Sequence, residues 1–237
     1  MQIKVHPADT RGQVDFGWLQ SRHTFSFGHY YDPERVHFGA LRVINDDTVA
    51  GGKGFGMHHH DNMEIISIPL SGDLEHKDSM GNQTVIRSGD IQVMSAGTGI
   101  HHSEYNKNKD IPVKFLQIWV LPDKENVKPR YDQITLDAAT LNNQLTQVLS
   151  PDAGDAGVWI HQQAWFHLGR FDRPFTLSYP LKKKGNGVYI FILSGDLSLN
   201  GRTYHQRDGL GITGTDEVEI SSAGPAEFLV MEVPMLG

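Results

Sequence analysis

Residues 63–94 read MEIISIPLSGDLEHKDSMGNQTVIRSGDIQVM and decide the fold class of this chain. Three short apolar runs, at 63–70, 84–86 and 91–94, are separated by turn-type residues such as Ser71-Gly72-Asp73. Runs of this length between clusters of Gly, Asn and Asp are typical of β-strands joined by tight turns. The segment therefore predicts a fold rich in strands.

The same pattern extends along the chain. Further strands are predicted at Ala40–Ile44 and Lys114–Leu121, with a turn at Asn45-Asp46-Asp47. The first half has no long apolar period of 3.6 residues, and Leu136–Leu141 is the one weak helical candidate. With 38% hydrophobic and 21% charged residues, the composition is that of a globular protein with a sizeable core. We predict a mostly β protein.

Composition also excludes several kinds of function. The formal net charge of −7 argues against a nucleic-acid-binding surface, which needs clustered Lys and Arg. Because the chain has no cysteine, disulfides, zinc–thiolate sites and cysteine-bound iron–sulfur clusters are excluded. The N-terminal segment lacks the apolar core of a signal peptide, and no apolar run approaches the roughly 20 residues that span a bilayer. We expect a soluble, cytoplasmic monomer that binds neither membranes nor nucleic acids directly.

An internal repeat divides the 237 residues, which could form one large domain or two. The sequence LSGDL at 70–74 recurs at 193–197, each time after a strand-like apolar run and before a Gly-containing turn. Five residues can match by chance, but the shared order of strand, turn and strand favours tandem duplication. The polar segment from Pro122, with prolines near both ends, reads as a linker. We predict an N-terminal domain at 1–121, a linker at 122–135 and a C-terminal domain at 136–237.

Two histidine clusters predict a metal site. In each cluster two metal-capable side chains alternate: His58 and His60, then His102 and Glu104. Alternate residues of a strand share one face, so two adjacent strands would point three imidazoles and one carboxylate into one volume. A chance surface run or a tag is the alternative. It is disfavoured because the run is internal and the second cluster repeats the alternation.

The neighbouring side chains are expected to take other places. His59 and His101 are displaced by one residue and should face away from the metal. Glu64 would share the face of His60 in an unbroken strand, as a fifth donor or, as we favour, as an acceptor for a ligand N–H. His76 is equally well a pocket-lining residue or an ordinary strand histidine. The remaining histidines are expected at surface or structural positions: His6, His23, His29, His37, His161, His167 and His205.

The repeat provides an internal control on the metal site. The offset between the two copies places the four ligand positions at Leu181, Lys183, Ser222 and Gly224. The second copy therefore lacks every candidate ligand, and we predict one metal ion per chain. A set of three histidines and one carboxylate suits iron(II), manganese(II), nickel(II), cobalt(II) or zinc(II).

Several stretches carry a family resemblance. These are GWLQSRHTFSF (17–27), YYDP (30–33), FGALRVINDD (38–47), FGMHHHDNMEI (55–65), EHKDSMGN (75–82) and MSAGTGIHHSEYN (94–106). From about Arg11 to Tyr131 the chain resembles the pirin family of the cupin superfamily, most closely the short bacterial pirins with quercetin 2,3-dioxygenase activity. The second half resembles the family only loosely.

The resemblance implies an all-β bicupin, with two tandem β-barrel (jelly-roll) cupin domains and a metal, usually iron, in the N-terminal one. The ligands of the family fall on His58, His60, His102 and Glu104, in agreement with the alternation. Pirins use this later glutamate instead of the one that follows the first histidine pair in other cupins. Two departures are local: many pirins have proline at position 59 and arginine at position 101, where this chain has histidines.

The resemblance further implies an iron(II)-dependent dioxygenase that acts on a small phenolic substrate, a flavonol such as quercetin. Glu104, or a carboxylate near it, would accept the proton of a substrate hydroxyl. The alternative is a non-enzymatic, metal-binding regulatory protein that acts through a protein partner. The sequence leaves both functions open.

Overall fold

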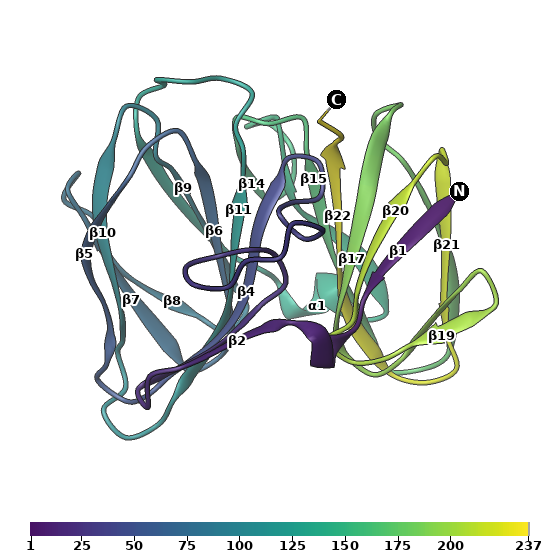
Figure 1. The fold of residues 1–237 in the computed structure, drawn as a ribbon, viewed down its shortest axis with the longest axis horizontal. Coiled ribbons are helices and arrows are strands. Elements are labelled where there is room, and N and C mark those ends of the chain that lie inside the picture. Colours follow the sequence, from purple (N-terminus) through teal and green to yellow (C-terminus); the bar gives the residue numbers. More distant parts are fainter. Residues whose placement is uncertain (237) are drawn as a thin grey trace.

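The computed structural model describes residues 1–236, which form two β-barrel halves side by side (Figure 1). Each half consists of one seven-stranded and one four-stranded sheet. The predicted all-β class and the two cupin-like domains are thus confirmed. Besides the 3₁₀ turn η1 (Ala8–Thr10), the described chain contains one short helix, α1 (Ala138–Leu141), inside the predicted helical segment.

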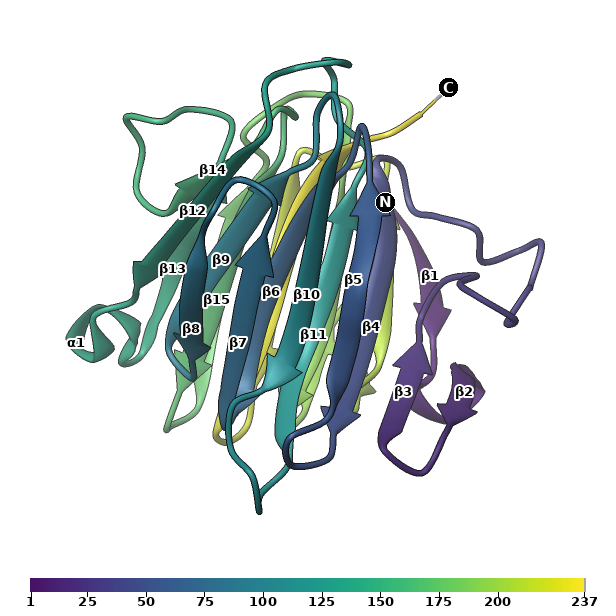
Figure 2. The ribbon, with the colours of Figure 1, turned by 90° about the vertical axis from the view of Figure 1, so that its left-hand side faces the viewer.

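In the N-terminal half the two sheets face each other (Figure 2). The seven-stranded sheet has the order β12 (Arg130–Thr135), β9 (Asp90–Ser95), β6 (Glu64–Ser71), β11 (Val113–Val120), β4 (Leu41–Val49), β3 (Leu19–His23) and β2 (Gly12–Asp15). The four-stranded sheet has the order β5 (Gly54–His60), β10 (Ile100–Asn106), β7 (Asp73–Asp78) and β8 (Gln83–Arg87). The strands predicted from apolar runs lie in β4, β6, β8, β9 and β11.

The C-terminal half repeats this architecture. Its seven-stranded sheet has the order β1 (Gln2–His6), β20 (Gly209–Thr213), β17 (Asn186–Ser194), β22 (Ala226–Pro234), β15 (Trp165–Phe171), β13 (Gln144–Ser150) and β14 (Val158–Trp159). Its four-stranded sheet has the order β16 (Phe175–Pro180), β21 (Glu217–Ser222), β18 (Leu197–Leu199) and β19 (Arg202–Tyr204). The two sheet orders correspond, as expected of a duplicated chain, except at one edge, where β2 pairs antiparallel with β3 but β14 pairs parallel with β13.

The two halves exchange edge strands. β1, from the start of the chain, pairs with β20 in the C-terminal sheet. β12, from the segment expected to be linker, pairs with β9 at the same place in the N-terminal sheet. With domain bounds at 121 and 136, β1 would belong to the N-terminal half and β12 to the linker. In the structure β1 belongs to the C-terminal sheet and β12 to the N-terminal sheet. Edge pairing leads to this arrangement because an uncovered edge exposes unpaired backbone N–H and C=O groups.

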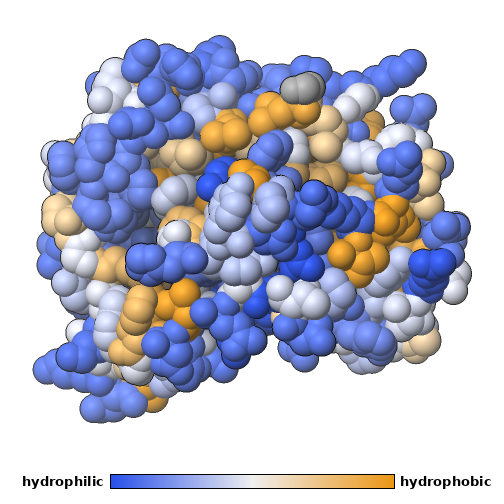
Figure 3. Space-filling model, viewed as in Figure 1, coloured by the Kyte–Doolittle hydropathy of each residue, from blue (hydrophilic) through white to orange (hydrophobic). Residues whose placement is uncertain are grey.

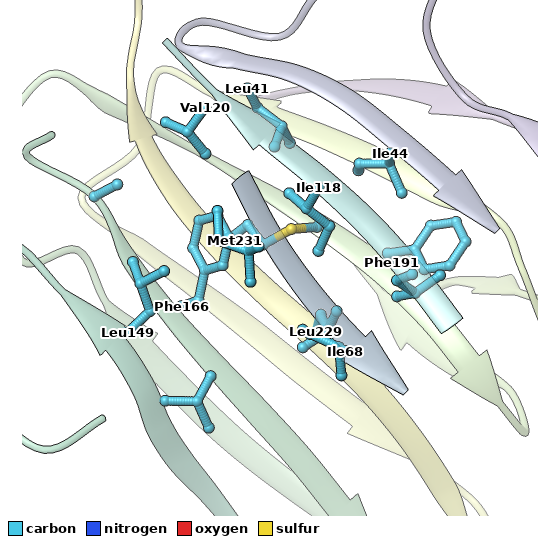
Figure 4. Close-up of a cluster of buried hydrophobic side chains, with 14 of the residues drawn as sticks. Leu41, Ile44, Ile68, Ile118, Val120, Leu149, Phe166, Phe191, Leu229 and Met231 are labelled. Carbon is cyan, nitrogen blue, oxygen red and sulfur yellow. The ribbon is translucent and has the colours of Figure 1, made fainter. Parts of the chain in front are cut away.

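The seven-stranded sheets pack back to back around the largest core of the protein. Figure 4 shows Ile44 and Ile118 of the N-terminal half beside Phe166, Leu229 and Met231 of the C-terminal half. These five side chains are fully buried. The continuous apolar layer joins the halves and leaves the two four-stranded sheets on the outside.

The turn predicted at Asn45-Asp46-Asp47 is wrong. β4 continues through these residues to Val49 and pairs with β11 and β3. Asn45 and Asp47 are each 3% exposed, because they point into the N-terminal barrel while Ile44 points to the core between the halves. Polar residues here mark a polar barrel interior and not a turn.

The face in Figure 3 is mainly hydrophilic, with small separate hydrophobic patches. Within residues 1–236, no helix has the length and apolar character that crossing a bilayer requires.

Candidate metal centre

The three predicted histidine ligands meet inside the N-terminal barrel. β5 and β10 are antiparallel neighbours, and their register places His102 directly opposite His58. The ring centroids lie 4.4 Å apart for His58 and His102, and 5.0 Å apart for His60 and His102. One potential ligand atom from each of the three rings lies within 4.8 Å of the others. The two strands thus gather three imidazoles at one point.

A backbone contact selects the ring nitrogen that His58 presents. The Nδ1 atom of His58 lies 2.7 Å from the carbonyl oxygen of Gly56. A carbonyl oxygen only accepts hydrogen bonds, so Nδ1 must carry the hydrogen and the lone pair remains on Nε2. A hydrogen bond from the second ring nitrogen to a backbone carbonyl commonly orients a metal-binding histidine. The register between β5 and β10 also shifts here, between His102, which pairs with His58, and Glu104, which pairs with Phe55.

Burial favours the neutral form of His60 and His102, which is the form that metal ligation requires. The pKa of His102 is lowered to about 3 by burial and, next, by the nearby His58. The pKa of His60 is lowered to about 4 by burial and then by His102 and His58. His102 is only 1% exposed, yet neither of its ring nitrogens has a hydrogen-bond partner in the described chain. A buried polar atom without a partner is costly, and a metal ion would supply that partner for His102. The three histidines therefore form a site suited to a divalent metal ion.

Glu104 lies in the same barrel but is held by other side chains. It is 1% exposed. Its Oε1 accepts a hydrogen bond from Ser67 Oγ at 3.1 Å, and its Oε2 accepts one from Gln117 Nε2 at 2.6 Å. Glu104 is outside the group of three whose ligand atoms lie within 4.8 Å of one another. Its place as a fourth ligand stays a prediction.

A cavity of about 210 Å³ opens beside the histidines. Its wall combines aromatic and aliphatic side chains with a few buried polar groups. The lining residues are Leu19, Ser21, His23, Phe27, Asn45, Asp47, Phe55, His58, His60, Glu104, Gln117 and Trp119. The ring of Trp119 meets that of His60 edge to face at 4.9 Å. A small, largely apolar molecule with a few polar groups fits such a lining.

Sequence reasoning missed several polar residues of this cavity, among them Asp47 and His23. Burial raises the pKa of Asp47 to about 7, and its Oδ1 has no hydrogen-bond partner in the part of the chain described. His23, expected at a surface or structural position, is 4% exposed and lines the cavity, and burial lowers its pKa. The alternation of Asn45 and Asp47 in one strand would have revealed the first, had it not been read as a turn.

The neighbouring histidines differ in position as predicted. His59 and His101 are exposed, and their rings pair on the outer face of the sheet with centroids 4.8 Å apart. The prediction that they face away from the other three is confirmed. His76 on β7 is fully buried, with its ring centroid 5.3 Å from that of His102, and it is not among the residues that line the cavity.

The expected role of Glu64 beside the metal is wrong. β5 ends at His60, and Asn62, with φ of 41°, turns the chain into β6 of the other sheet. Glu64 shares its face with Ile66, which belongs to the core between the halves. There its Oε2 accepts a hydrogen bond from Ser95 Oγ at 2.7 Å. The turn interrupts the alternation on which the expectation depended.

This burial makes Glu64 a source of pH-dependent stability. Burial raises its pKa from 4.5 to about 7. Between these values the unfolded state loses its proton first, so the contribution of Glu64 to stability is lost as the pH rises through this window, by on the order of 3 kcal/mol. Glu64→Gln has no such proton. We expect its free energy of unfolding, relative to the wild type, to rise by this amount and then level off above pH ~7, in urea unfolding at several pH values.

The matched control is Glu219→Gln, the same substitution at an exposed strand position. Its difference from the wild type should not change with pH. A difference for Glu64→Gln that is equally flat would contradict the raised pKa.

The C-terminal half keeps the strand pair but not the ligands. β16 and β21 take the places of β5 and β10. Tyr179, Val218 and Ile220 fill this part of the C-terminal barrel and are at most 2% exposed. The repeat offset misplaced the first pair of equivalents, since Leu181 lies beyond the end of β16 at Pro180. Among residues 1–236, the three histidines of the N-terminal half form the single group suited to a metal.

Comparisons with known proteins agree with this site and fold. The pirin family model matches residues 4–120, and a model described as the quercetinase C-terminal cupin domain matches residues 147–233. A protein named quercetin 2,3-dioxygenase, from Escherichia coli strain K12, is 40% identical over 232 residues, which are 98% of this chain and 99% of that protein.

Solved structures extend the similarity to the whole fold. The crystal structure of YhhW from Escherichia coli matches with a TM-score of 0.95 at 38% identity and covers 99% of both chains. The structure of bacterial pirin YhhW in complex with nickel(II), also from Escherichia coli, matches with a TM-score of 0.94 at 37% identity, over 99% of this chain and 100% of that one. With a similarity that spans both halves, this chain belongs to the pirin family.

Proposed function

We propose that this protein is a metal-dependent dioxygenase that cleaves flavonols such as quercetin. The observation that carries the proposal is the set of three converging histidines beside a cavity with aromatic walls. The relative named quercetin 2,3-dioxygenase, which aligns with 98% of the chain, supports the same activity.

We further propose iron(II) as the metal in the cell and Glu104 as its fourth ligand. Nitrogen and carboxylate donors without sulfur suit iron(II), and they also admit the nickel(II) that YhhW binds. The ion, when bound, supplies Lewis acidity and a redox-active centre for dioxygen chemistry. The hydrogen bonds from Ser67 and Gln117 hold the carboxylate of Glu104 inside the barrel, where Glu104 lines the cavity.

The cavity residues bind the substrate and move its proton. Phe27, Phe55 and Trp119 offer flat apolar contacts to an aromatic ring. At about 210 Å³ the cavity is smaller than the roughly 300–1,000 Å³ of pockets for drug-sized ligands, so it admits part of a flavonol and leaves the rest at the mouth. Glu104, as the proposed base, accepts the proton of a substrate hydroxyl, and Asp47 is a second carboxylate in the same cavity.

Oxygen consumption tests this function. Protein purified without a nickel-affinity step, stripped of metal and reloaded with iron(II), should consume dioxygen when quercetin is added. The metal-free protein should not, and neither should the loaded protein with a flavone that lacks the 3-hydroxyl group, since that substrate has no such proton to give up. Equal consumption with and without metal would contradict the proposal, as would no consumption by iron-loaded protein.

A further inference from the structure

On the two neighbouring rings of His76 and His102, three buried nitrogens lack a hydrogen-bond partner within the part of the chain that the structure describes. Two belong to His102, and the third is Nδ1 of His76. His76 is 0% exposed and His102 is 1% exposed, so bulk water does not reach either ring. A metal ion can bind one nitrogen of His102. The other two nitrogens then remain to be explained.

The hydrogen bonds of Asp78 determine which nitrogen of His76 carries a hydrogen. Oδ1 of Asp78 accepts from the backbone N–H groups of Met80 and Asn82, and Oδ2 accepts from the side-chain amide of Asn82. A carboxyl group with this many donors acts as an acceptor. Nε2 of His76 lies 3.0 Å from Oδ2 of Asp78 and must therefore donate to it. In the neutral imidazole, Nδ1 of His76 is then a lone pair, which can only accept.

The same reasoning applied to His102 gives the complementary group. A neutral imidazole has one N–H and one lone pair. When the lone pair of His102 binds a metal, its other nitrogen is an N–H that needs an acceptor. The unpartnered acceptor next to it is Nδ1 of His76.

The two rings lie close enough for this pair to form. The ring centroids of His76 and His102 lie 5.3 Å apart. Ring nitrogens lie about 1.2 Å from the centroid, so two nitrogens that face each other would be about 3 Å apart, the length of a hydrogen bond. The present ring orientations do not form this bond, so the pair requires the ring of His102 to turn about χ2 while His76 keeps its bond to Asp78. Tyr131 covers His76 at a centroid distance of 4.7 Å and holds this ring in place.

We propose that Asp78, His76 and His102 form a hydrogen-bonded relay that orients His102 and strengthens it as a metal ligand. Asp78 fixes the tautomer of His76, and Nδ1 of His76 accepts the N–H of His102. His76 and Asp78 are positioning residues, since neither belongs to the metal-binding group of three. The relay rests on the metal site of the proposed function, but it requires neither dioxygen chemistry nor a phenolic substrate.

Metal affinity tests the relay. We expect His76→Phe to bind cobalt(II) about 10- to 100-fold more weakly than the wild type, in competition with a chelator, because partners of a ligating histidine contribute that much. His76→Asn should recover part of the loss, since its Oδ1 restores an acceptor near the position of Nδ1. Asp78→Asn should weaken binding in the same direction. Tyr131→Phe is the matched control, which keeps the ring over His76, and its affinity should not change.

A spectroscopic readout separates the relay from a merely structural role. In the zinc-loaded protein, nitrogen-15 NMR should show a slowly exchanging ring N–H of His102 whose signal is lost in His76→Phe, while the circular dichroism of the metal-free variant is unchanged. An affinity of His76→Phe within about twofold of the wild type would overturn the relay. An equal loss in Tyr131→Phe would overturn it too. Because both readouts use metal binding alone, a protein that does not consume oxygen with quercetin can still show the relay.

Discussion

His102→Ala is expected to weaken metal binding by about 100- to 1,000-fold, the share of one ligand in a site of three or four. His102 is the most deeply buried of the three histidines, and its ring lies near those of both His58 and His60. Without it, two imidazoles from one strand remain. The metal content after purification and the affinity from chelator competition measure the loss.

His101→Ala provides the matched control. It is the same substitution one position earlier in β10, but this ring lies on the outer face with His59. We expect full metal content and unchanged affinity. If both variants kept the metal, or if His101→Ala lost it to the same extent, the assignment of inward and outward histidines would be refuted.

Glu104→Gln is expected to lower the rate of oxygen consumption with quercetin by about 100-fold or more at equal iron content. Glutamine has nearly the same shape and can still accept from Ser67, but it carries no negative charge and cannot take up a proton. Gln117, which donates to Oε2 at 2.6 Å, would face an altered partner.

The control for this variant is Glu75→Gln on β7. The carboxylate of Glu75 forms an ion pair with Lys107 at 2.6 Å and does not line the cavity. The rate of this control should equal that of the wild type. Equal rates in Glu104→Gln and the wild type would rule out the proposed role of Glu104 as a base.

The sequence predicts the histidine group because the alternation of side chains along a strand is a local property. Alternation along a strand separates His58 and His60 from His59 without any knowledge of the partner strand. The pairing of His58 with His102 is different, since it depends on how β5 and β10 come together and on a register shift beside Glu104. Register between strands distant in sequence is decided by the whole barrel.

The same local rule fails where the chain changes sheets. Glu64 lies four residues after His60, but the turn at Asn62 carries it into another sheet and to the opposite side. Asp47 was missed for a related reason, because Asn and Asp usually mark turns and here they line a barrel interior. The exchange of β1 and β12 is equally invisible locally, since both segments read only as polar or weakly apolar edges.

We propose above all that the three histidines and Glu104 hold a metal ion that supports dioxygenase chemistry. The most direct measurement is mass spectrometry of the product formed from quercetin under ¹⁸O₂ by iron(II)-loaded protein, beside metal-free protein. We expect a ring-cleaved product that contains both labelled oxygen atoms, formed only by the loaded protein. Uncleaved oxidised quercetin, or a product whose new oxygen comes from water, would contradict the claim.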